Sequence, residues 1–426
     1  MGVIMQAFYW DCPRVEAKEY RWWNFVKERI PSLKSAGFTA LWLPPACKAA
    51  NLSGASMGYD PYDFYDLGNI NQKGTTKTWF GSKDELLGLI AAAHASGMDV
   101  YADLVINHNS GGDAQEANPI DQQQRWTKFT PGSGKFLRNY IHFHPSPYES
   151  WDQMTFGDMP DLCHRNPYVY TQIIEYATWL LEEVGFDGFR YDCVKGYGGW
   201  MVRAIQELCA IRNGMPIRPF GVGECWDSDR KIGDWLDETN AWSDNRARAF
   251  DFPLRDRLKK LCDVYGFSLR NLVSSGTLMN DRPTEAVTFV ENHDVARDKP
   301  IINDKMLAYA FILTHEGYPC VFWHDYYNLN LGLEGGQSGI AALARAHKDH
   351  AGGAASVLYV DDDFYVMQRN GNGEQKGLLF VLNNRGDAWR GEWVKTQWNN
   401  TRLVPVAWRG QNDAGMPREQ NTQANG

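Results

Sequence analysis

Three acidic residues, Asp192, Glu224 and Asp294, each follow a short apolar run at a place where such a run would end as a β-strand. Taken alone, each is explained equally well as the N-cap of the next helix and as a catalytic group. Carboxyl groups that meet in one site cannot all keep their ordinary pKa values, and this divides them into nucleophile, base and acid. The three residues therefore indicate acid and base chemistry, provided that one fold brings them together.

Two of these acids have neighbours that favour different protonation states. Arg190 stands two residues before Asp192, so both side chains of a strand would point to the same side, and the guanidinium would favour an ionised nucleophile. Glu224 lies beside apolar residues and near Trp226, where a raised pKa would suit a general acid. One ionised and one protonated carboxyl group are the equipment of glycoside hydrolysis. Their separation, which decides between retention and inversion, is left open by the residues alone.

The pattern of strand-like and helix-like segments around these residues predicts an α/β fold, a (β/α)8 TIM barrel. Short runs rich in β-branched and aromatic residues alternate with longer amphipathic stretches between residues 3 and 322. The expected strands are Val3–Tyr9, Thr39–Leu43, Val100–Ile106, Gly188–Tyr191, Gly221–Gly223, Ala249–Phe252, Ala286–Val290 and Cys320–Phe322. The expected helices include Trp22–Ser35, Lys83–Ala95, Tyr168–Val184, Trp200–Ile211, Leu254–Val264 and Lys305–Thr314. Active sites of such barrels lie at the C-terminal strand ends, where all three acids stand.

The barrel is expected to comprise residues 1–107 and 163–350. Residues 108–162 contain many glycines and prolines with little helical periodicity, which predicts a loop-rich domain inserted after the third strand. From residue 351 onward, alternating runs between turn signals predict a C-terminal antiparallel β domain over 351–426. Its strands are expected at Val357–Val360, Phe364–Arg369, Gly377–Leu382 and Trp389–Val394. The polar end, 411–426, leaves open whether this domain is complete.

Composition excludes several classes of protein. The net charge of −9 disfavours nucleic acid as a partner, and no apolar window has the length of a membrane helix. No signal segment precedes the first expected strand, so Met1 is either native or stands where a signal peptide was removed. The eight cysteines include no CxxC pair and predict mostly free, buried thiols. Seventeen tryptophans exceed the usual needs of packing and favour an aromatic core, a sugar-stacking cleft, or both.

Four segments resemble the signature segments of the α-amylase family, glycoside hydrolase family 13. They are Asp103–His108, Gly188–Gly196, Gly223–Trp226 and Phe289–Asp294, and they occur in the family's order at the matching strands. The similarity runs through nearly the whole chain, and it looks closest to the calcium-dependent archaeal and plant branch at Gly2–Asp11, Tyr59–Asp66 and Phe156–Cys163. The resemblance implies an endo-acting α-1,4-glucan hydrolase that cleaves starch or glycogen with retention, through a covalent glycosyl-enzyme intermediate.

The resemblance also implies roles for individual residues. Asp192 matches the nucleophile, Glu224 the general acid/base, and Asp294 the third carboxylate, which binds sugar hydroxyls and distorts the ring. Further substrate-binding positions are Tyr59, His108, Arg190, Lys195, Gly196, Trp226 and His293. One departure from the family lies near the last strand, where Trp323 and His324 occupy a run that is often Tyr-x-Gly-x-Glu.

Metal ligands are likewise implied by the resemblance. Calcium would be held by Asn107, Asp152, Met154, Asp161 and Gly196, and hard oxygen donors in a loose cage suit Ca²⁺ better than Mg²⁺. Some archaeal members place zinc beside calcium with two histidines and a cysteine. The matching residues here are His144, Glu149 and Cys163, so a glutamate replaces one histidine, and a buried Cys163 without a metal is the alternative.

Other interpretations are a related transglycosylase or debranching enzyme, and an inactive barrel that only binds glucan. Lys195 and Gly196 after the nucleophile favour α-1,4 specificity, and the presence of all three carboxylates argues against an inactive barrel. We expect a monomer that binds α-glucan or maltooligosaccharide, with neither nucleic acid nor membrane as a partner. Because starch cannot cross a membrane intact, we expect a secreted or periplasmic enzyme, although an intracellular enzyme acting on glycogen would have the same residues.

Overall fold

Eight parallel strands form a closed barrel in the computed structural model, which describes residues 2–13, 21–51, 57–150, 154–333, 336–386, 388–410 and 419–426. The barrel strands are β1 Ile4–Gln6, β2 Ala40–Trp42, β5 Asp99–Leu104, β8 Gly188–Tyr191, β11 Phe220–Gly223, β12 Arg248–Phe250, β13 Ala286–Phe289 and β14 Tyr318–Phe322. Their order around the barrel is β1-β14-β13-β12-β11-β8-β5-β2. Each strand overlaps one that the sequence predicts, and nearly all of their residues are buried, as expected for strands covered on both faces. The predicted TIM barrel is confirmed.

The chain divides into two compact units. Unit 1 comprises Met1–Gln6, Ser32–Thr39 and Asp251–Gly426, and unit 2 comprises Ala7–Pro31 and Ala40–Phe250. In unit 2, β5 pairs with β8 so that Asp103 lies opposite Arg190, and β8 pairs with β11 so that Tyr191 lies opposite Gly223. This register brings the C-terminal ends of the three strands level with one another.

Two helices of unit 2, α3 Lys83–Ala95 and α4 Pro167–Trp179, begin at side-chain caps. The other helices of this unit are α1 Trp22–Lys27, α5 Gly199–Gln206 and α6 Asp229–Thr239, with α2 Ile30–Ala36 at the boundary with unit 1. The Ser82 hydroxyl accepts from the Glu85 N–H, and the Glu85 carboxylate accepts from the Ser82 N–H, which forms a capping box before α3. Asn166 caps α4, which has Pro167 at its first turn and continues as a π-helical segment, Leu180–Val184.

One predicted helix of unit 2 is wrong at its end. Trp200–Ile211 was expected to be helical, but α5 ends at Gln206, and Ala210–Arg212 (β9) pairs with Met215–Ile217 (β10). Asn213 and Gly214 form the turn between them with φ of 53° and 76°. Positive φ at both central residues is the requirement of a two-residue hairpin turn, so this local turn chemistry overrides the helical pattern.

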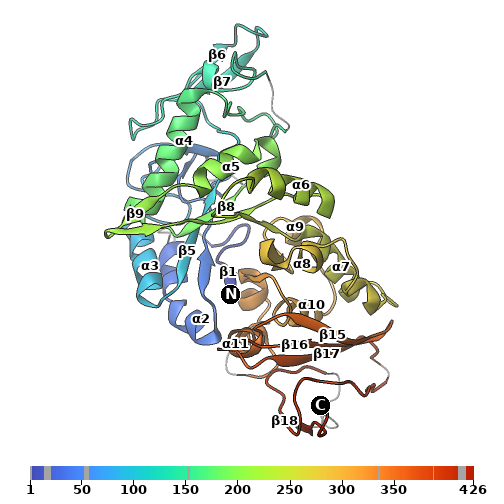
Figure 1. Ribbon diagram of the computed structural model, residues 1–426. Helices are drawn as coiled ribbons and strands as arrows, with labels where there is room; N and C mark the ends of the chain where they lie inside the picture. Colours follow the sequence, from blue (N-terminus) through green and yellow to red (C-terminus); the bar gives the residue numbers. More distant parts are fainter. Residues whose placement is uncertain are drawn as a thin grey trace. The chain divides into compact units, whose positions relative to one another are not determined.

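The segment 108–162 contains a hairpin and little other regular structure. Strands β6 Ala114–Ala117 and β7 Gln124–Lys128 pair antiparallel and lie side by side in Figure 1. A short 3₁₀ turn, η1, spans Tyr140–His142, and the strands β3 Lys48–Ala49 and β4 Pro61–Asp63 pair in the preceding part of unit 2. Backbone bridges join His108 to Asp161 and Phe143 to Leu162. The two ends of the segment are therefore tied to each other next to β5.

Unit 1 combines three barrel strands with helices and a C-terminal sheet. Its α-helices are α7 Phe252–Asp263, α8 Leu278–Asp281, α9 Val295–Asp298, α10 Lys305–Ile312 and α11 Ile340–His350. Short 3₁₀ turns lie at Leu269–Leu272 and Pro283–Glu285, and a π-helical segment, η6, spans His324–Asn328. Asp251 caps α7 by accepting from the Leu254 N–H at 3.0 Å.

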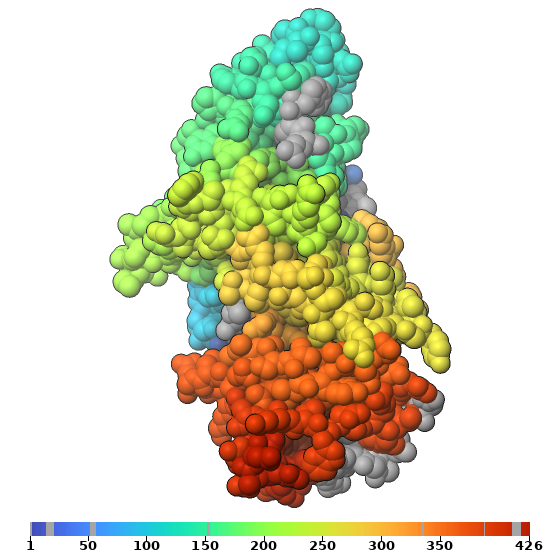
Figure 2. Space-filling model, turned by 45° about the vertical axis from the view of Figure 1, so that its right-hand side comes forward, coloured from blue at the N-terminus to red at the C-terminus, as the bar shows by residue number. Residues whose placement is uncertain are grey.

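The C-terminal sheet has three antiparallel strands in the order β15-β16-β17, and its segment forms one continuous orange to red body in Figure 2. The strands are β15 Ala355–Val360, β16 Phe364–Arg369 and β17 Leu378–Asn383, where the sequence predicts three of its four strands. The fourth, Trp389–Val394, is wrong, because all of its residues are described and none of them is in a strand. Instead, Trp389 and Trp393 are 61 % and 87 % exposed, and β18 Arg402–Leu403 pairs with β19 Gln420–Asn421.

Two further sequence expectations concern cysteines and membranes. All eight cysteines are described and free, and six of them are buried, as predicted. Among the helices of the described ranges, none is both long enough and apolar enough to cross a membrane.

Candidate active site

The guanidinium of Arg190 binds three carboxylates at the ends of neighbouring strands of unit 2. Its Nη1 lies 2.9 Å from Asp103 Oδ1 and 2.6 Å from Asp192 Oδ1, and its Nη2 lies 3.0 Å from Glu224 Oε2. Burial lowers the pKa of Arg190, but the surrounding carboxylates raise it more, so the pKa lies well above its ordinary value. A permanent positive charge therefore stands at the centre of the site. The sequence predicts the pair with Asp192 but not the other two.

Asp103 connects this charge to an aromatic side chain. Besides Arg190, its carboxylate accepts from the Tyr59 hydroxyl at 2.7 Å and from Trp42 Nε1 at 3.1 Å. Burial raises the pKa of Asp103 to about 7, against the opposing pull of Arg190. Asp103 thus orients both Arg190 and Tyr59, a role that sequence reasoning missed although the residue begins a quoted motif.

Asp192 and Glu224 are tied together through the backbone. The Cys193 N–H donates to Glu224 Oε2 at 3.0 Å, and the Glu224 N–H donates to the Tyr191 carbonyl at 3.0 Å. Cys193 has φ 47° and ψ 46°, a left-handed turn that ends β8 immediately after Asp192. The side chains of Asp192 and Glu224 stay 9 % and 14 % exposed, so both reach the surface of this end of the barrel. The two carboxyl groups are neighbours that a ligand can contact.

His108 is held between backbone and an aromatic ring. Its Nε2 lies 2.9 Å from the Tyr59 carbonyl, and the Phe156 ring stacks on it with centroids 4.7 Å apart and planes 12° apart. Burial lowers the pKa of His108, although nearby Asp192 opposes this. Phe156 is 42 % exposed and was not predicted as part of the site. The sequence signal for Phe156 was its place at the start of the quoted segment Phe156–Cys163.

Lys195 and Trp226 lie just beyond Asp192 and Glu224. The Lys195 ammonium donates to the Trp226 carbonyl at 3.0 Å and lies 3.7 Å from the Asp227 carboxylate. The bond joins the segment after β8 to the segment after β11. The structure therefore brings Tyr59, His108, Arg190, Lys195 and Trp226 to the same strand ends of unit 2 as the two acids.

Asp294 and His293 follow β13 in unit 1. Asn292 Oδ1 accepts from the Asp294 N–H at 3.0 Å and from the Val295 N–H at 2.8 Å, which starts α9. His293 Nδ1 lies 3.0 Å from Gln6 Nε2, and its Nε2 lies 3.3 Å from Asp294 Oδ2. Arg297 approaches the other oxygen of Asp294 at 3.4 Å. These contacts orient the third predicted carboxylate within its own unit.

The predicted calcium ligands fit a hard cation. Asn107 Oδ1 is buried and has no hydrogen-bond partner within the described part of the chain. A Cβ placed on Gly196 would collide with this oxygen and come within 3.0 Å of the Met154 carbonyl oxygen, so amide and carbonyl oxygens converge here. Asp161 is buried and forms the backbone bridge to His108. Oxygen donors of this kind suit Ca²⁺. Asp152 lies outside the described residues.

The predicted zinc residues also come together. The ligand atoms of His144, Glu149 and Cys163 all lie within 4.8 Å of one another. Burial raises the pKa of the Cys163 thiol, so ligation by the thiolate would depend on the charge of a bound metal.

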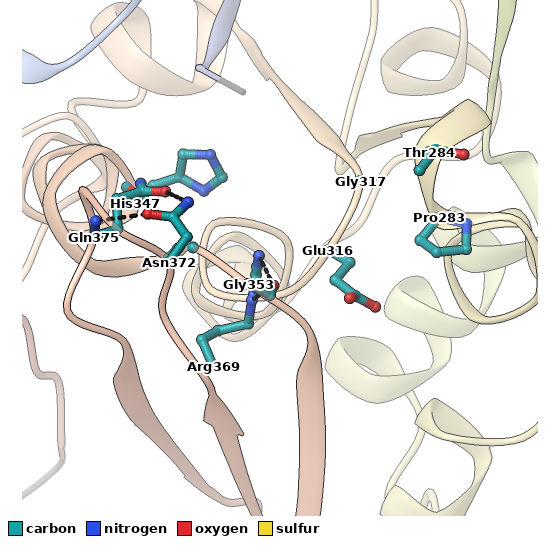
Figure 3. Close-up of a pocket in the computed structure, with 11 residues that line it drawn as sticks. Pro283, Thr284, Glu316, Gly317, His347, Gly353, Arg369, Asn372 and Gln375 are labelled. Carbon is teal, nitrogen blue, oxygen red and sulfur yellow. Dashed lines mark hydrogen bonds between the residues drawn. The ribbon is translucent and has the colours of Figure 1, made fainter.

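A cavity of about 210 Å³ lies within unit 1 and is lined by residues 283–284, 316–317, 347, 351–353, 369, 372 and 375 (Figure 3). Its polar side chains largely bond to one another and to the backbone. Arg369 donates to the Gly353 carbonyl through Nε at 3.0 Å and Nη2 at 2.7 Å, and Asn372 donates to Gln375 Oε1 at 3.2 Å. The cavity contains none of the three predicted catalytic carboxylates, and its bonding is that of a structural junction between α11 and β16.

Comparison with known proteins identifies the family to which this chain is similar. The family model described as the alpha amylase catalytic domain matches residues 22–327. An alpha-amylase of Geobacillus stearothermophilus is 34 % identical, over 88 % of this chain and 76 % of the relative. A relative named cytoplasmic alpha-amylase, from Escherichia coli, is 27 % identical over 90 % of this chain and 88 % of its own length.

A solved structure shares the fold. The alpha-amylase from Geobacillus thermoleovorans, complexed with acarbose, superposes with a TM-score of 0.66 at 20 % identity, and the match covers 100 % of this chain and 94 % of that chain. The matched family model, the relatives and the three carboxylates bound to Arg190 at the strand ends all point to one family. The chain belongs to the alpha-amylase family of glycoside hydrolases.

Proposed function

We propose that the protein is an endo-acting α-1,4-glucan hydrolase that cleaves starch, glycogen and maltooligosaccharides with retention of configuration. The observation that carries this proposal is that Asp192 and Glu224 bind the two terminal nitrogens of one guanidinium, that of Arg190. Retaining glycosidases need carboxyl groups only about 5–5.5 Å apart, and a shared guanidinium favours such close spacing.

The reaction would proceed in two steps at this pair. In the first, the Asp192 carboxylate attacks the anomeric carbon while Glu224 donates its proton to the departing glycosidic oxygen, leaving a covalent glycosyl ester. In the second, the Glu224 carboxylate takes a proton from water, the water oxygen attacks the same carbon, and Asp192 leaves. Arg190 would orient the Asp192 carboxylate for its attack and stabilise that carboxylate when it leaves.

The other predicted residues would bind sugar. Asp294 would accept hydrogen bonds from ring hydroxyls, and Tyr59, His108 and His293 would surround the ring whose bond is cleaved. Lys195, Gly196 and Trp226 would contact the leaving part of the chain. The support for these roles is that the residues stand at or just beyond C-terminal strand ends of one barrel, or, for Tyr59, bind such a residue directly.

Calcium is the proposed cofactor. Asn107, Met154, Asp161 and Gly196 would hold it, together with Asp152, by side-chain and backbone oxygens. The ion would supply a fixed positive charge that ties the segment ending at Asp161 to β5 and to the turn after Asp192. Zinc at His144, Glu149 and Cys163 is proposed as a second metal, and the proximity of their ligand atoms supports it.

Removal of calcium by EDTA is expected to lower the melting temperature by about 3–5 °C, because an ion that binds only the folded chain stabilises it by mass action. Added Ca²⁺ should restore the original value in a calorimetric scan, whereas Mg²⁺ should not. A melting temperature that EDTA leaves unchanged would contradict the calcium site. Restoration by Zn²⁺ alone would assign the effect to His144, Glu149 and Cys163 instead.

Product analysis on amylose, pullulan and maltotriose tests the proposed function. We expect amylose to give a mixture of short maltooligosaccharides that are released as α-anomers, with the α-1,6 bonds of pullulan left intact. Cyclic products, or products longer than the substrate, would identify a transferase, and cleavage of α-1,6 bonds a debranching enzyme. No product from any of the three would indicate a glucan-binding barrel.

We further propose that the protein is exported, because starch cannot cross a membrane intact, and that it acts as a monomer. The relative named cytoplasmic alpha-amylase is compatible with the other location, action on stored glycogen. Fractionation of the native host and light scattering of the purified protein would decide both points.

A further inference from the structure

The loop of residues 290–301 carries His293 and Asp294 and is closed at its base by two buried residues. These are Glu291, at the start of the loop, and Arg255, on helix α7. Neither belongs to the residues assigned so far to substrate or catalysis.

Glu291 joins the two ends of the loop through one carboxylate. Its Oε2 accepts from Arg255 Nη2 at 2.8 Å, and its Oε1 accepts from the Ile301 N–H at 2.6 Å. Glu291 immediately precedes Asn292, and its side chain binds the backbone of Ile301, ten residues later in the chain. The loop is therefore fastened across its own base.

Arg255 fastens the same two ends from the side of α7. Its Nε donates to the Val290 carbonyl at 3.2 Å, and its Nη2 donates to the Lys299 carbonyl at 2.6 Å. One guanidinium thus binds backbone before and after the segment that holds Asp294. Hydrogen bonds to backbone at both ends restrict how the loop can shift relative to α7.

Two further charged residues, Lys305 and Asp325, extend this cluster. Lys305 of α10 lies 3.3 Å from Glu291 and 2.8 Å from Asp325, and the Tyr309 hydroxyl donates to Asp325 at 2.7 Å. Two cations therefore face two carboxylates, and the cluster links the loop to α7, α10 and η6. Such a buried cluster is weak support for a stabilising role, since apolar residues of similar size often stabilise a fold equally well.

We propose that Glu291 and Arg255 are positioning residues that hold the 290–301 loop so that Asp294 meets the sugar correctly. The inference rests on the proposed role of Asp294. The hydrogen bonds of Glu291 and Arg255 end on the backbone of Val290, Lys299 and Ile301. They therefore hold the chain itself at both ends of the loop. From this base, Asn292 orients Asp294 by accepting its N–H.

The experiment compares Glu291→Gln with Glu291→Asp and with a control, Asp187→Asn. Asp187 pairs with Arg212 just before β8, at the opposite, N-terminal ends of the strands. Displacement of a positioned group by about 1 Å costs roughly 100-fold in rate, so Glu291→Gln should lower kcat on starch by about 10- to 100-fold with little change in KM. Glu291→Asp should recover part of the loss. Asp187→Asn should lower the melting temperature and leave kcat nearly unchanged.

A second comparison asks whether Glu291 acts through Asp294. In an Asp294→Asn background, assayed on a nitrophenyl maltooligosaccharide, Glu291→Gln should change kcat by less than about twofold, because effects that pass through one residue do not multiply. An unchanged kcat in Glu291→Gln, or the full loss repeated in the Asp294→Asn background, would overturn the proposal. If Glu291→Gln does not fold, wild-type kcat in Glu291→Asp overturns it. A wild-type protein inactive on starch would refute the proposed function instead.

Discussion

Replacement of Asp192 by asparagine is expected to abolish the release of reducing sugar from soluble starch, with a loss of at least about 10⁴-fold in kcat. The amide cannot attack the anomeric carbon, so no glycosyl ester forms. The melting temperature should stay close to that of the wild type, because Arg190 keeps its bonds to Asp103 and Glu224, and Tyr197 binds the backbone carbonyl of residue 192 rather than its side chain.

The matched control for this variant is Asp234→Asn. Asp234 is an exposed carboxylate on α6 that pairs only with Arg230 at 3.8 Å, so its loss should change neither kcat nor stability measurably. Reducing-sugar assays measure the activity, and calorimetry the melting temperature, of the wild type, Asp192→Asn and Asp234→Asn. Together they distinguish a loss of catalysis from a loss of folding. Substantial starch hydrolysis by the Asp192→Asn protein would refute the assignment of the nucleophile.

Replacement of Arg190 by glutamine should damage both stability and activity. It removes the one cation that Asp103, Asp192 and Glu224 share and leaves three carboxyl groups facing one another in a largely buried site. Breaking a buried pair from one side costs about 3–5 kcal/mol, which corresponds to a fall in melting temperature of about 3–6 °C for a chain of this length. We expect kcat to fall by at least about 10³-fold, because neither catalytic carboxylate keeps its orientation.

Arg190→Lys separates charge from geometry at the same position. An ammonium restores the positive charge but lacks the planar fork that spans Asp192 and Glu224. We therefore expect much of the melting temperature to return while kcat stays low. A glutamine variant that melts with the wild type, or a lysine variant with wild-type kcat, would contradict the structural role given to Arg190.

Those parts of the fold that depend on local pattern could be predicted from the sequence. The eight barrel strands are short, apolar and separated by amphipathic helices, so their number and order were readable, and with them the barrel and the strand-end position of the three acids. Pairing register was not readable, because it depends on strands far apart in the chain. For this reason Asp103, which the register places opposite Arg190, received no role, and the bond between Arg190 and Glu224 was missed.

The wrong elements have local explanations. The prediction of a helix as far as Ile211 did not take account of Asn213 and Gly214. This dipeptide is typical of a hairpin turn, and in the structure it forms the turn between β9 and β10. The strand expected at Trp389–Val394 rests on its apolar residues, yet in the structure Arg390 binds Asp361 at 2.8 Å and both tryptophans face solvent. An apolar run is a strand only where another strand is available to pair with it.

The sharing of Arg190 among three carboxylates has a consequence for which glucans the protein can accept. Where these carboxyl groups are ionised they outnumber the one guanidinium that they share, and the resulting negative potential would stabilise a sugar that gains positive charge as its glycosidic bond breaks. The same potential repels anions, so a glucose unit that carries a phosphate would enter at an electrostatic cost that a neutral unit avoids. We therefore expect the carboxyl groups around Arg190 to favour plain over phosphorylated starch.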